Sequence, residues 1–317
     1  MNEAVDRGGR LWAITSYFNP AGYRRRFANY RAFRAGLGVP LATIELSFDG
    51  NFQLQAGDAD VLVQIRGRDV MWQKERLLNH LLPLLPDACR EVVALDCDLV
   101  FPRSDWAAQV SAALCGAALV QPFRHVRHLP ADAGPDHVGE PGGLVEEALA
   151  SAIAAGQSAH EVLGRAGKRS DGGPTPGFAW AAPRDLLERH GFYDVCIVGG
   201  GDRALASAAF GGWEHAMERQ FLNQRQRERY LAWAEAFHRE VRGSVTCLEG
   251  DLFHLWHGTI ADRRTRQRHQ GLGVFAFDPG RDLALAESGC WQWASDKPEL
   301  HAYVRDYFFS RKEDGQD

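Results

Sequence analysis

The sequence predicts an α/β protein with a doubly wound, mixed but mostly parallel sheet and helices on both faces. Two observations favour this fold. Strand-like and helix-like segments alternate from Leu11 to Pro122, and the run Glu91–Leu95 is apolar after its first residue. A continuous apolar run is typical of a strand that is buried on both faces of a parallel sheet. In such sheets, ligands bind beyond the carboxyl ends of the strands, so we expect the functional residues there.

The expected elements follow from apolar periodicity and from the turn residues that end each run. The expected strands are Leu11–Tyr17, Leu41–Leu46, Asp60–Ile65, Glu91–Leu95, Ala117–Pro122, Gly177–Ala182 and Val245–His257. The expected helices are Tyr23–Leu37, Trp72–Leu85, Trp106–Cys115, Leu144–Ala155, Pro183–His190, one that begins at Gly199–Asp202, and a polar excursion over about 214–242.

The periodicity weakens between Arg124 and Pro176, where Gly, Pro, His and Asp are frequent. An irregular segment of this length indicates a flap over a binding site rather than a linker. We therefore expect one domain, at about residues 10–275, with a mobile flap at about 124–176 that closes over bound ligand. Residues 276–317 are expected to form a C-terminal tail.

The composition excludes several classes of protein. The chain has 317 residues, of which 45% are hydrophobic and 24% are charged, and its net charge of −5 argues against a protein that coats nucleic acid. Because no run of 18 apolar residues occurs, we expect no membrane span. The polar segment Met1–Arg10 does not resemble a signal peptide. The six cysteines are scattered and form no C-x-x-C pair, so we expect reduced thiols in a cytoplasmic protein.

Asp96-Cys97-Asp98 directly follows the buried strand Glu91–Leu95. Two carboxylates one residue apart on a strand point to opposite faces, so both can serve one site only if the chain turns between them. Such a turn is available at the end of a strand. One carboxylate could then bind a divalent cation while the other holds a ribose hydroxyl or a water molecule on the cation. A solvated turn or a helix cap is the alternative interpretation.

Two late histidines, His254 and His257, follow a strand-like stretch. Imidazole is a good ligand for Mn²⁺ and other first-row metals, so a histidine could complete a site that the aspartates begin. Residues three apart on a strand point to opposite faces, so we expect only one of the two to be a ligand. A pair of core histidines beside Trp256 is the alternative. The four arginines within Asp262–His269 suit a diphosphate or, equally, a solvated helical face.

Gly199-Gly200-Gly201-Asp202 matches neither a phosphate loop nor a dinucleotide fingerprint. The glycines permit close approach of a ligand to the backbone and place Asp202 at the start of a helix. Asp202 could be a general base or bind a sugar hydroxyl, and a simple helix cap is the alternative.

Lys74 and Arg76, at the start of the helix Trp72–Leu85, could hold phosphate or ribose, or lie on a plain surface turn.

Taken in this order, the elements from about Leu11 to His269 resemble the GT-A glycosyltransferases, a superfamily that uses nucleotide-diphosphosugars. The resemblance rests on an ordered set of segments. They are the strand Leu11–Tyr17, Glu45 at the end of the second strand, the helix Lys74–Asn79, Asp96-Cys97-Asp98, the Gly-Phe-x-Trp stretch that starts at Gly177, Gly199–Asp202, and His254–Gly258.

The resemblance implies a role for each matching residue. The nucleoside would be held by Thr15, Tyr17, Asn19 and Glu45, with Lys74, Arg76 and Asn79 as further residues that bind the nucleotide-sugar. Asp96 and Asp98 would hold Mn²⁺ or Mg²⁺ through the diphosphate, with His257, and less directly His254, as a metal ligand. Gly200, Gly201 and Asp202 would line the acceptor pocket. The sequence departs from the W-G-x-E-D pattern of inverting members, because one aspartate follows three glycines.

The function implied is a metal-dependent glycosyltransferase that moves a sugar from a nucleotide-diphosphate donor, with a UDP-sugar favoured, to a glycan or other hydroxyl acceptor. One alternative is a nucleotidyltransferase that makes sugar nucleotides, although Asn19–Gly22 is a poor version of its Gly-rich, basic loop. The other is a non-catalytic carbohydrate-binding module, for which the nine tryptophans could provide stacking surfaces. Such a module would need neither the paired aspartates nor the late histidine.

Overall fold

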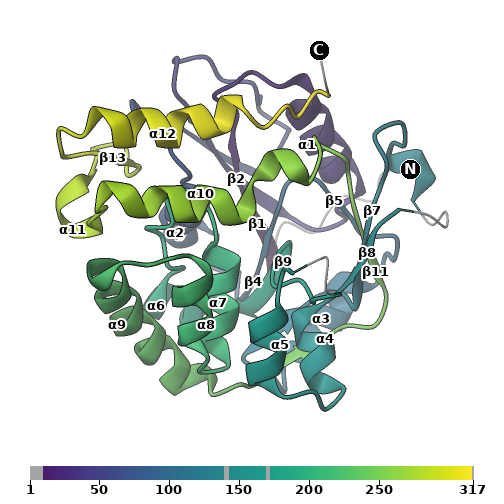
Figure 1. Cartoon of the computed structure of the whole chain (residues 1–317). Helices are drawn as coiled ribbons and strands as arrows, with labels where there is room; N and C mark the ends of the chain where they lie inside the picture. The colour runs from purple at the N-terminus through teal and green to yellow at the C-terminus, as the bar shows by residue number, and fades with distance from the viewer. Residues whose placement is uncertain (1–9, 139–142, 169–171, 316–317) are drawn as a thin grey trace.

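The computed structural model describes residues 10–138, 143–168 and 172–315 and is built around a seven-stranded sheet of order β10-β6-β9-β4-β1-β2-β3 (Figure 1). Its strands are β1 (Leu11–Phe18), β2 (Leu41–Ser47), β3 (Val61–Arg66), β4 (Glu91–Leu95), β6 (Leu119–Gln121), β9 (Ala179–Pro183) and β10 (Val245–Cys247). Only β9 runs antiparallel to its neighbours in this sheet. The prediction of a mixed, mostly parallel sheet is therefore confirmed.

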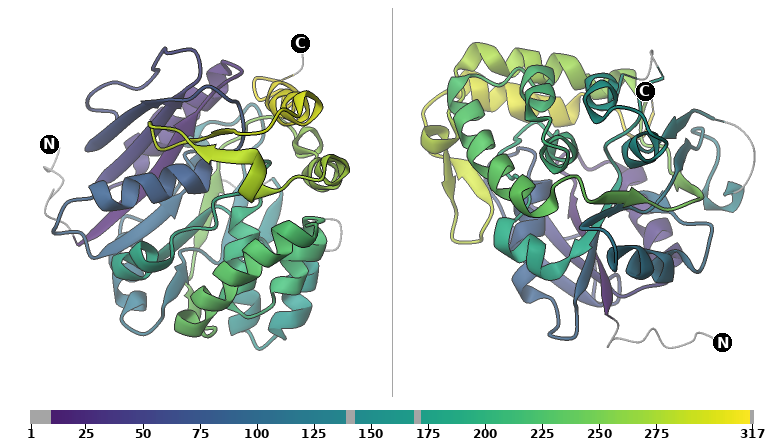
Figure 2. Two further views of the ribbon diagram at one scale, coloured as in Figure 1. Left: turned by 90° about the vertical axis from the view of Figure 1, so that its left-hand side faces the viewer. Right: turned by 90° about the horizontal axis from the view of Figure 1, so that it is seen from below.

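Both faces of this sheet are covered by helices, because successive strand residues point to opposite sides. In β1, Trp12 and Ile14 belong to one hydrophobic cluster, and Leu11 and Ala13 belong to the other. The first face is covered by α2 (Lys74–Leu81), α6 (Arg184–His190), α7 (Gly201–Ala209), α9 (Gln224–Val241) and α12 (Pro298–Phe309). The second is covered by α1 (Arg24–Gly36) and α3 (Trp106–Leu114). Figure 2 shows this layering from two further directions.

A second sheet of four strands, in the order β5-β11-β7-β8, lies beyond the carboxyl end of β4. Its strands are β5 (Leu99–Val100), β7 (His125–His128), β8 (Val145–Glu147) and β11 (Asp251–His254), and β12 (Leu283–Leu285) pairs with β13 (Trp291–Trp293) elsewhere. The other helical elements are α4 (Leu149–Ala154), α5 (Ala159–Arg165), α8 (Trp213–Arg219), α10 (Thr265–Leu272), α11 (Pro279–Asp282), η1 (Leu82–Leu84), η2 (Pro135–His137), η4 (Ala261–Arg263) and η5 (Gly273–Phe275).

The observed elements differ from the expected ones mainly where a single expected element divides into two. The run 245–257 divides at Gly250, whose φ of 119° favours glycine, and its two parts join different sheets. Near the start of the expected helix 144–155, residues 145–147 form β8 instead, because they pair with β7. Residues 214–242 form two helices, of which α9 begins at a capping box on Asn223. Because Pro83 has no amide hydrogen, the helix expected to reach residue 85 continues only as η1.

The segments expected to form a flap and a tail both contribute to the main core. Leu149 and Val162, from the segment 124–176, are fully buried in the same cluster as Leu300 and Val304 of α12. In Figure 1, α12 lies beside α10. This packing argues against a lid made of the whole segment 124–176 and against a tail that is separate from the domain. Residues 139–142, 169–171 and 316–317, which those expectations include, lie outside the described residues.

Two observations on the described residues concern the expectations about a membrane span and about disulfides. None of its helices combines the length and apolar character that a membrane crossing requires. All six cysteines are free.

Candidate active site

Strand pairing in the small sheet brings the late histidines to Asp98. β5 begins directly after Asp98 and runs antiparallel to β11, so that His254 lies opposite Leu99 and the amide of Leu255 donates to the Asp98 carbonyl at 2.8 Å. β11 ends at His254, and the chain then leaves the strand direction, which allows His257 to return to the same carboxylate. The expectation that only one histidine could reach the site assumed one strand over 245–257, and the chain turn explains the difference.

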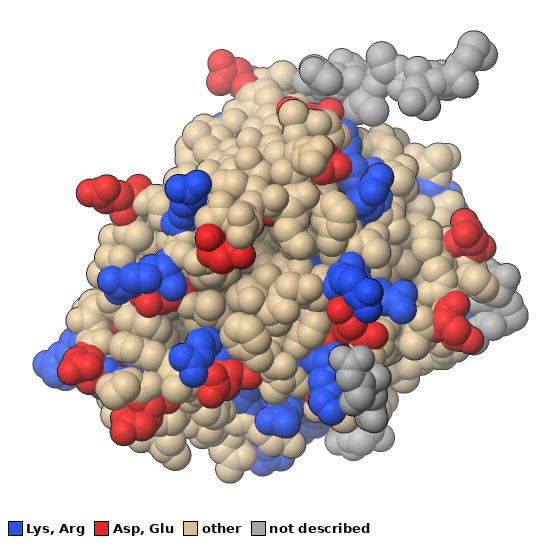
Figure 3. Space-filling view, turned by 90° about the horizontal axis from the view of Figure 1, so that it is seen from above, with Lys and Arg blue, Asp and Glu red and all other residues tan. Residues whose placement is uncertain are grey.

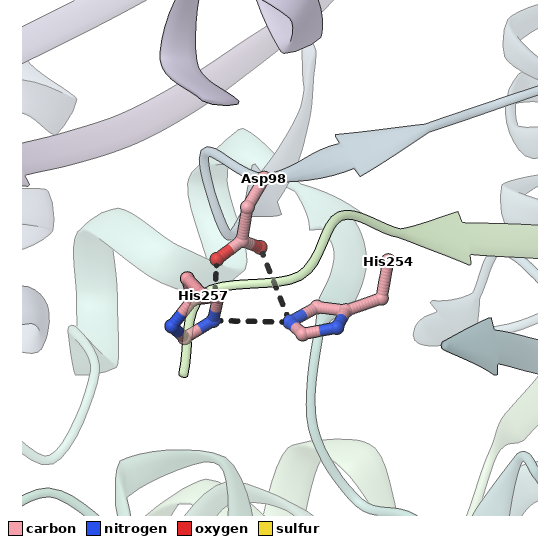
Figure 4. Close-up of side chains that lie close together, drawn as sticks. All are labelled: Asp98, His254 and His257. Carbon is pink, nitrogen blue, oxygen red and sulfur yellow. Dashed lines mark hydrogen bonds and ion pairs between the residues drawn. The ribbon is translucent and has the colours of Figure 1, made fainter. Parts of the chain in front are cut away.

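Asp98, His254 and His257 form a compact cluster, which we call the triad (Figure 4). His257 Nε2 lies 3.0 Å from Asp98 Oδ2, His254 Nε2 lies 3.8 Å from Asp98 Oδ1, and the two Nε2 atoms are 3.1 Å apart. Asp98 Oδ1 is buried and accepts no hydrogen bond from the described residues, which is costly unless a cation satisfies it. Two imidazoles and one carboxylate fit Mn²⁺ or a similar first-row ion better than Mg²⁺, which prefers oxygen ligands.

A second pair of side chains, His128 and Glu146, determines which ring nitrogen of His254 is unprotonated. His128 Nε2 lies 2.7 Å from Glu146 Oε2, and its Nδ1 lies 3.1 Å from His254 Nδ1. An ionised carboxylate can only accept, so His128 donates through Nε2 and accepts at Nδ1 from His254. His254 then presents an unprotonated Nε2 to the triad. This inferred tautomer is the one that a metal ligand requires.

The C-terminal segment closes the other side of the triad. Glu313 is 1% exposed, and its Oε1 lies 3.7 Å from His257 Nδ1. Arg26 binds this carboxylate through two hydrogen bonds of 2.8 and 2.9 Å, and Arg311 lies 2.7 Å from it. Burial opposes ionisation of Glu313, but Arg26 and Arg311 outweigh burial and hold its pKa well below the ordinary value. An ionised carboxylate thus stands behind His257, as is common for metal-binding histidines.

Lys74 joins Asp96 to Asp202. Its ammonium Nζ lies 2.7 Å from Asp96 Oδ1 and 3.0 and 3.2 Å from the two carboxylate oxygens of Asp202. Burial alone would lower the pKa of Lys74, but Asp202 and Asp96 outweigh burial and raise it above the ordinary value. Lys74 is therefore charged at neutral pH. The structure brings Asp96 to this ion pair, whereas Asp98 alone of the two aspartates joins the histidines.

Asp202 lies in the first turn of α7 and is not its cap, because Gly200 occupies the capping position with a φ of 107°. Gly201 packs on Glu75, and a Cβ atom there would lie 2.1 Å from Glu75 Oε1. The absence of side chains at both glycines brings Asp202 to the wall of a cavity of about 190 Å³, which we call the Asp202 cavity.

A smaller cavity of about 100 Å³, the triad cavity, contains the three triad residues. It adjoins the Asp202 cavity, because the two share Trp72, Lys74, Asp96, Phe178, Arg263 and Arg311. Thr15 lines the triad cavity, where its hydroxyl donates to the carbonyl of Leu95 at 2.7 Å. The paired aspartates, the late histidines and the Gly-Asp segment thus meet in one region, and the aspartates lie at the carboxyl end of β4, where ligands are expected.

Three of the four residues expected at the nucleoside, Tyr17, Asn19 and Glu45, line a third cavity of about 200 Å³, the Tyr17 cavity. The Tyr17 hydroxyl and the Asn19 amide both donate to Gln53 Oε1, at 2.7 and 2.9 Å. The Glu45 carboxylate accepts a hydrogen bond of 2.6 Å from the backbone amide of Gln53. The structure therefore gathers these residues around one loop, residues 47–54, beside the ends of β1 and β2.

Arg76 and Asn79 are placed differently from the other candidates. Arg76 lies 3.0 Å from Asp194, and Asn79 exchanges hydrogen bonds of 2.9 and 2.7 Å with the backbone of Phe192. These contacts tie α2 to the loop after α6. Neither side chain lines the Asp202, triad or Tyr17 cavity.

Sequence reasoning missed His128, Glu146, Arg311 and Glu313. The alternation of polar and apolar residues in His125–His128 could have indicated a strand, whereas Val145–Glu147 shows no such alternation. No local pattern marks Glu313, because its role depends on where α12 ends in space.

Solved structures of other proteins are partly similar to this chain. No protein-family model matches the chain, and no curated protein is significantly similar to it in sequence. A mannosyltransferase from Pyrobaculum calidifontis, PcManGT, solved with GDP-Man and Mn²⁺, is 16% identical with a TM-score of 0.40 over 87% of this chain. The match spans 66% of the PcManGT chain, slightly less than two thirds. S. aureus TarS, residues 1–349, is 10% identical with a TM-score of 0.38, over 73% of this chain and 72% of that one.

Proposed function

We propose that the protein is a metal-dependent glycosyltransferase that moves a sugar from a nucleotide-diphosphosugar to a hydroxyl acceptor. One observation carries the proposal: the triad and Asp202 line adjoining cavities at the carboxyl edge of the sheet, and the cations Arg263 and Arg311 line both. A two-histidine, one-carboxylate site alone would also suit an iron oxygenase, but the basic walls favour a diphosphate ligand.

The chain's own residues divide the work as follows. Asp98, His254 and His257 would hold the cation, and Mn²⁺ suits them best. When bound, the ion supplies positive charge that offsets the charge of the departing diphosphate. Arg263 and Arg311 are placed to bind phosphate oxygens. Tyr17, Asn19 and Glu45 bind the nucleoside in the Tyr17 cavity, and we favour a UDP-sugar as the donor.

The acceptor enters the Asp202 cavity. The Asp202 carboxylate takes the proton of the acceptor hydroxyl as that oxygen attacks the anomeric carbon. Lys74 keeps this carboxylate at the cavity wall through two contacts. Gly177 and Gly200 line the same cavity and leave room for a sugar ring.

The test measures the release of nucleoside diphosphate from UDP-, GDP-, dTDP- and CDP-sugars, with and without Mn²⁺. We expect metal-dependent release from one donor class and its loss in Asp98→Asn. Asp132→Asn, at an exposed aspartate away from the cavities, is the matched control and should behave as the wild type. No release from any donor in the presence of Mn²⁺ would contradict the proposal. Formation of nucleoside triphosphate from a sugar nucleotide and pyrophosphate would instead indicate a nucleotidyltransferase.

A further inference from the structure

The Asp202 cavity carries a group of basic side chains that the donor's diphosphate does not explain. Arg203, Arg219, Arg268 and His269 line this cavity and do not line the triad cavity. The acids that line the same cavity, Asp96 and Asp202, are bound to Lys74. The face shown in Figure 3 has acidic and basic side chains interspersed, and the whole chain carries a net charge of −5, so this concentration of positive charge is local.

Arg203 is the clearest member of the group. It follows Asp202 in α7 and is partly buried, yet within the described ranges it forms no hydrogen bond or ion pair with another side chain. Burial, and then the neighbouring charge of Arg219, lower its pKa to about 10. Its guanidinium lies on Gly167, where a Cβ atom would be 2.5 Å from Nη2. A partly buried guanidinium that has no acidic partner among the described residues is unfavourable, so the cavity wall at Arg203 suits an anion.

Arg268 and His269 add to the same environment. The Arg268 guanidinium stacks 5.9 Å from the Trp72 ring and 4.9 Å from the Tyr307 ring, and its buried Nε has no hydrogen-bond partner among the described residues. Stacking fixes the guanidinium plane, and Nη1 donates a hydrogen bond to the Tyr307 hydroxyl, so that Nε is the donor left for a ligand. Burial, and then Arg268, Arg203 and Arg219, lower the pKa of His269 far enough to keep it neutral. The ring therefore adds a hydrogen-bonding group without adding charge.

We propose that Arg203 and Arg268 bind a phosphate-type oxyanion carried by the acceptor. The inference rests on the proposed function and adds the chemical class of its acceptor. Its position supports the acceptor rather than the donor, because Arg203 is adjacent to the proposed base Asp202, whereas the donor's diphosphate is expected at the triad. Arginine suits this ligand because its planar fork binds two oxygens of one phosphate.

The experiment measures binding of glycerol phosphate and of glycerol, by calorimetry, to the full-length protein with and without saturating UDP and Mn²⁺. We expect the wild type to bind glycerol phosphate and not glycerol. The double variant Arg203→Gln, Arg268→Gln should bind glycerol phosphate about tenfold to a hundredfold more weakly, as loss of charged hydrogen bonds does. Its UDP affinity should stay at the wild-type value. Arg225→Gln, at an exposed arginine of α9, is the matched control.

Three results would overturn the inference: no binding of glycerol phosphate by the wild type, equal binding by the double variant, or a matching loss of UDP affinity, which would assign these arginines to the donor. The melting temperature of each variant shows whether it is folded, and Arg203→Lys, which keeps the charge but not the fork, should lie between the two. Failure of the proposed function would appear separately, as the absence of metal-dependent release of nucleoside diphosphate.

Discussion

At the residue scale, Asp202 and Lys74 decide whether the Asp202 cavity is a reaction site. Asp202→Asn keeps the shape of the side chain but cannot accept a proton. We expect nucleotide affinity to remain while turnover falls by about 10²–10⁴-fold. The measurements are the melting temperature, UDP affinity and turnover of this one variant. A variant that loses stability but turns over normally per folded molecule would contradict the role of base.

Glu146 offers a test of the hydrogen-bond chain behind His254. Glu146→Gln can present an amide NH to His128, which would reverse the donor and acceptor roles along the chain and protonate the Nε2 of His254. We expect Mn²⁺ affinity to fall about 10- to 100-fold, which calorimetry can measure. Glu147→Gln is the matched control, because Glu147 is adjacent in β8 but accepts from Ser151. Equal Mn²⁺ affinities in the two variants would argue against the chain.

The sequence identifies the triad residues because each follows a strand and carries a metal-binding group. The sequence does not show that both histidines reach Asp98, since their positions depend on where β11 ends. The sequence cannot indicate His128 either. Its contact with His254 arises from the parallel pairing of β7 with β11, and the partners of such short strands are set by tertiary packing.

At the element scale, the contact between α2 and α7 places a buried acid beneath the glycine segment. Glu75 is 4% exposed, and burial raises its pKa to about 8. A carboxyl whose pKa is raised by folding contributes stability below its unfolded pKa and loses it as the pH rises through its folded pKa. We expect wild-type stability to fall between about pH 5 and 9, and Glu75→Gln to flatten that dependence. Parallel pH profiles in urea unfolding would contradict this.

A substitution in α12 can test whether residues 276–315 belong to the domain. Leu300 is fully buried in the main cluster, so Leu300→Ala should reduce the free energy of unfolding by about 2–5 kcal/mol. Leu285→Ala, at a leucine that is 55% exposed, should cost much less. A Leu300→Ala cost as small as that of the control would restore the interpretation of this segment as a tail.

The elements predicted correctly include β1, β2, β4 and α1, whose own residues form a continuous apolar run or an amphipathic pattern. The mispredicted ones are short and depend on partners far along the chain. β8 looks helical locally because it runs into the helical alanines of α4, and only its pairing with β7 makes it a strand.

At the scale of the whole molecule, the candidate site lies where three parts of the chain meet. The large sheet provides Asp98 after β4, the small sheet provides His254, and the C-terminal segment provides Glu313. Because these parts are close only in the folded protein, a metal ion that binds there stabilises the native state by mass action. The end of β1 contributes to two cavities, because Tyr17 lines the Tyr17 cavity and Thr15, Ser16 and Phe18 line the triad cavity.

The most direct test of metal-dependent nucleotide binding is the Kd of UDP and GDP, measured by calorimetry with Mn²⁺ and with excess chelator, for the wild type and for His257→Gln. We predict that one nucleotide binds the wild type tightly only with Mn²⁺, and that His257→Gln removes most of this metal dependence while the protein stays folded. The same affinity with and without Mn²⁺, or an unchanged metal dependence in His257→Gln, would contradict the triad as the metal site.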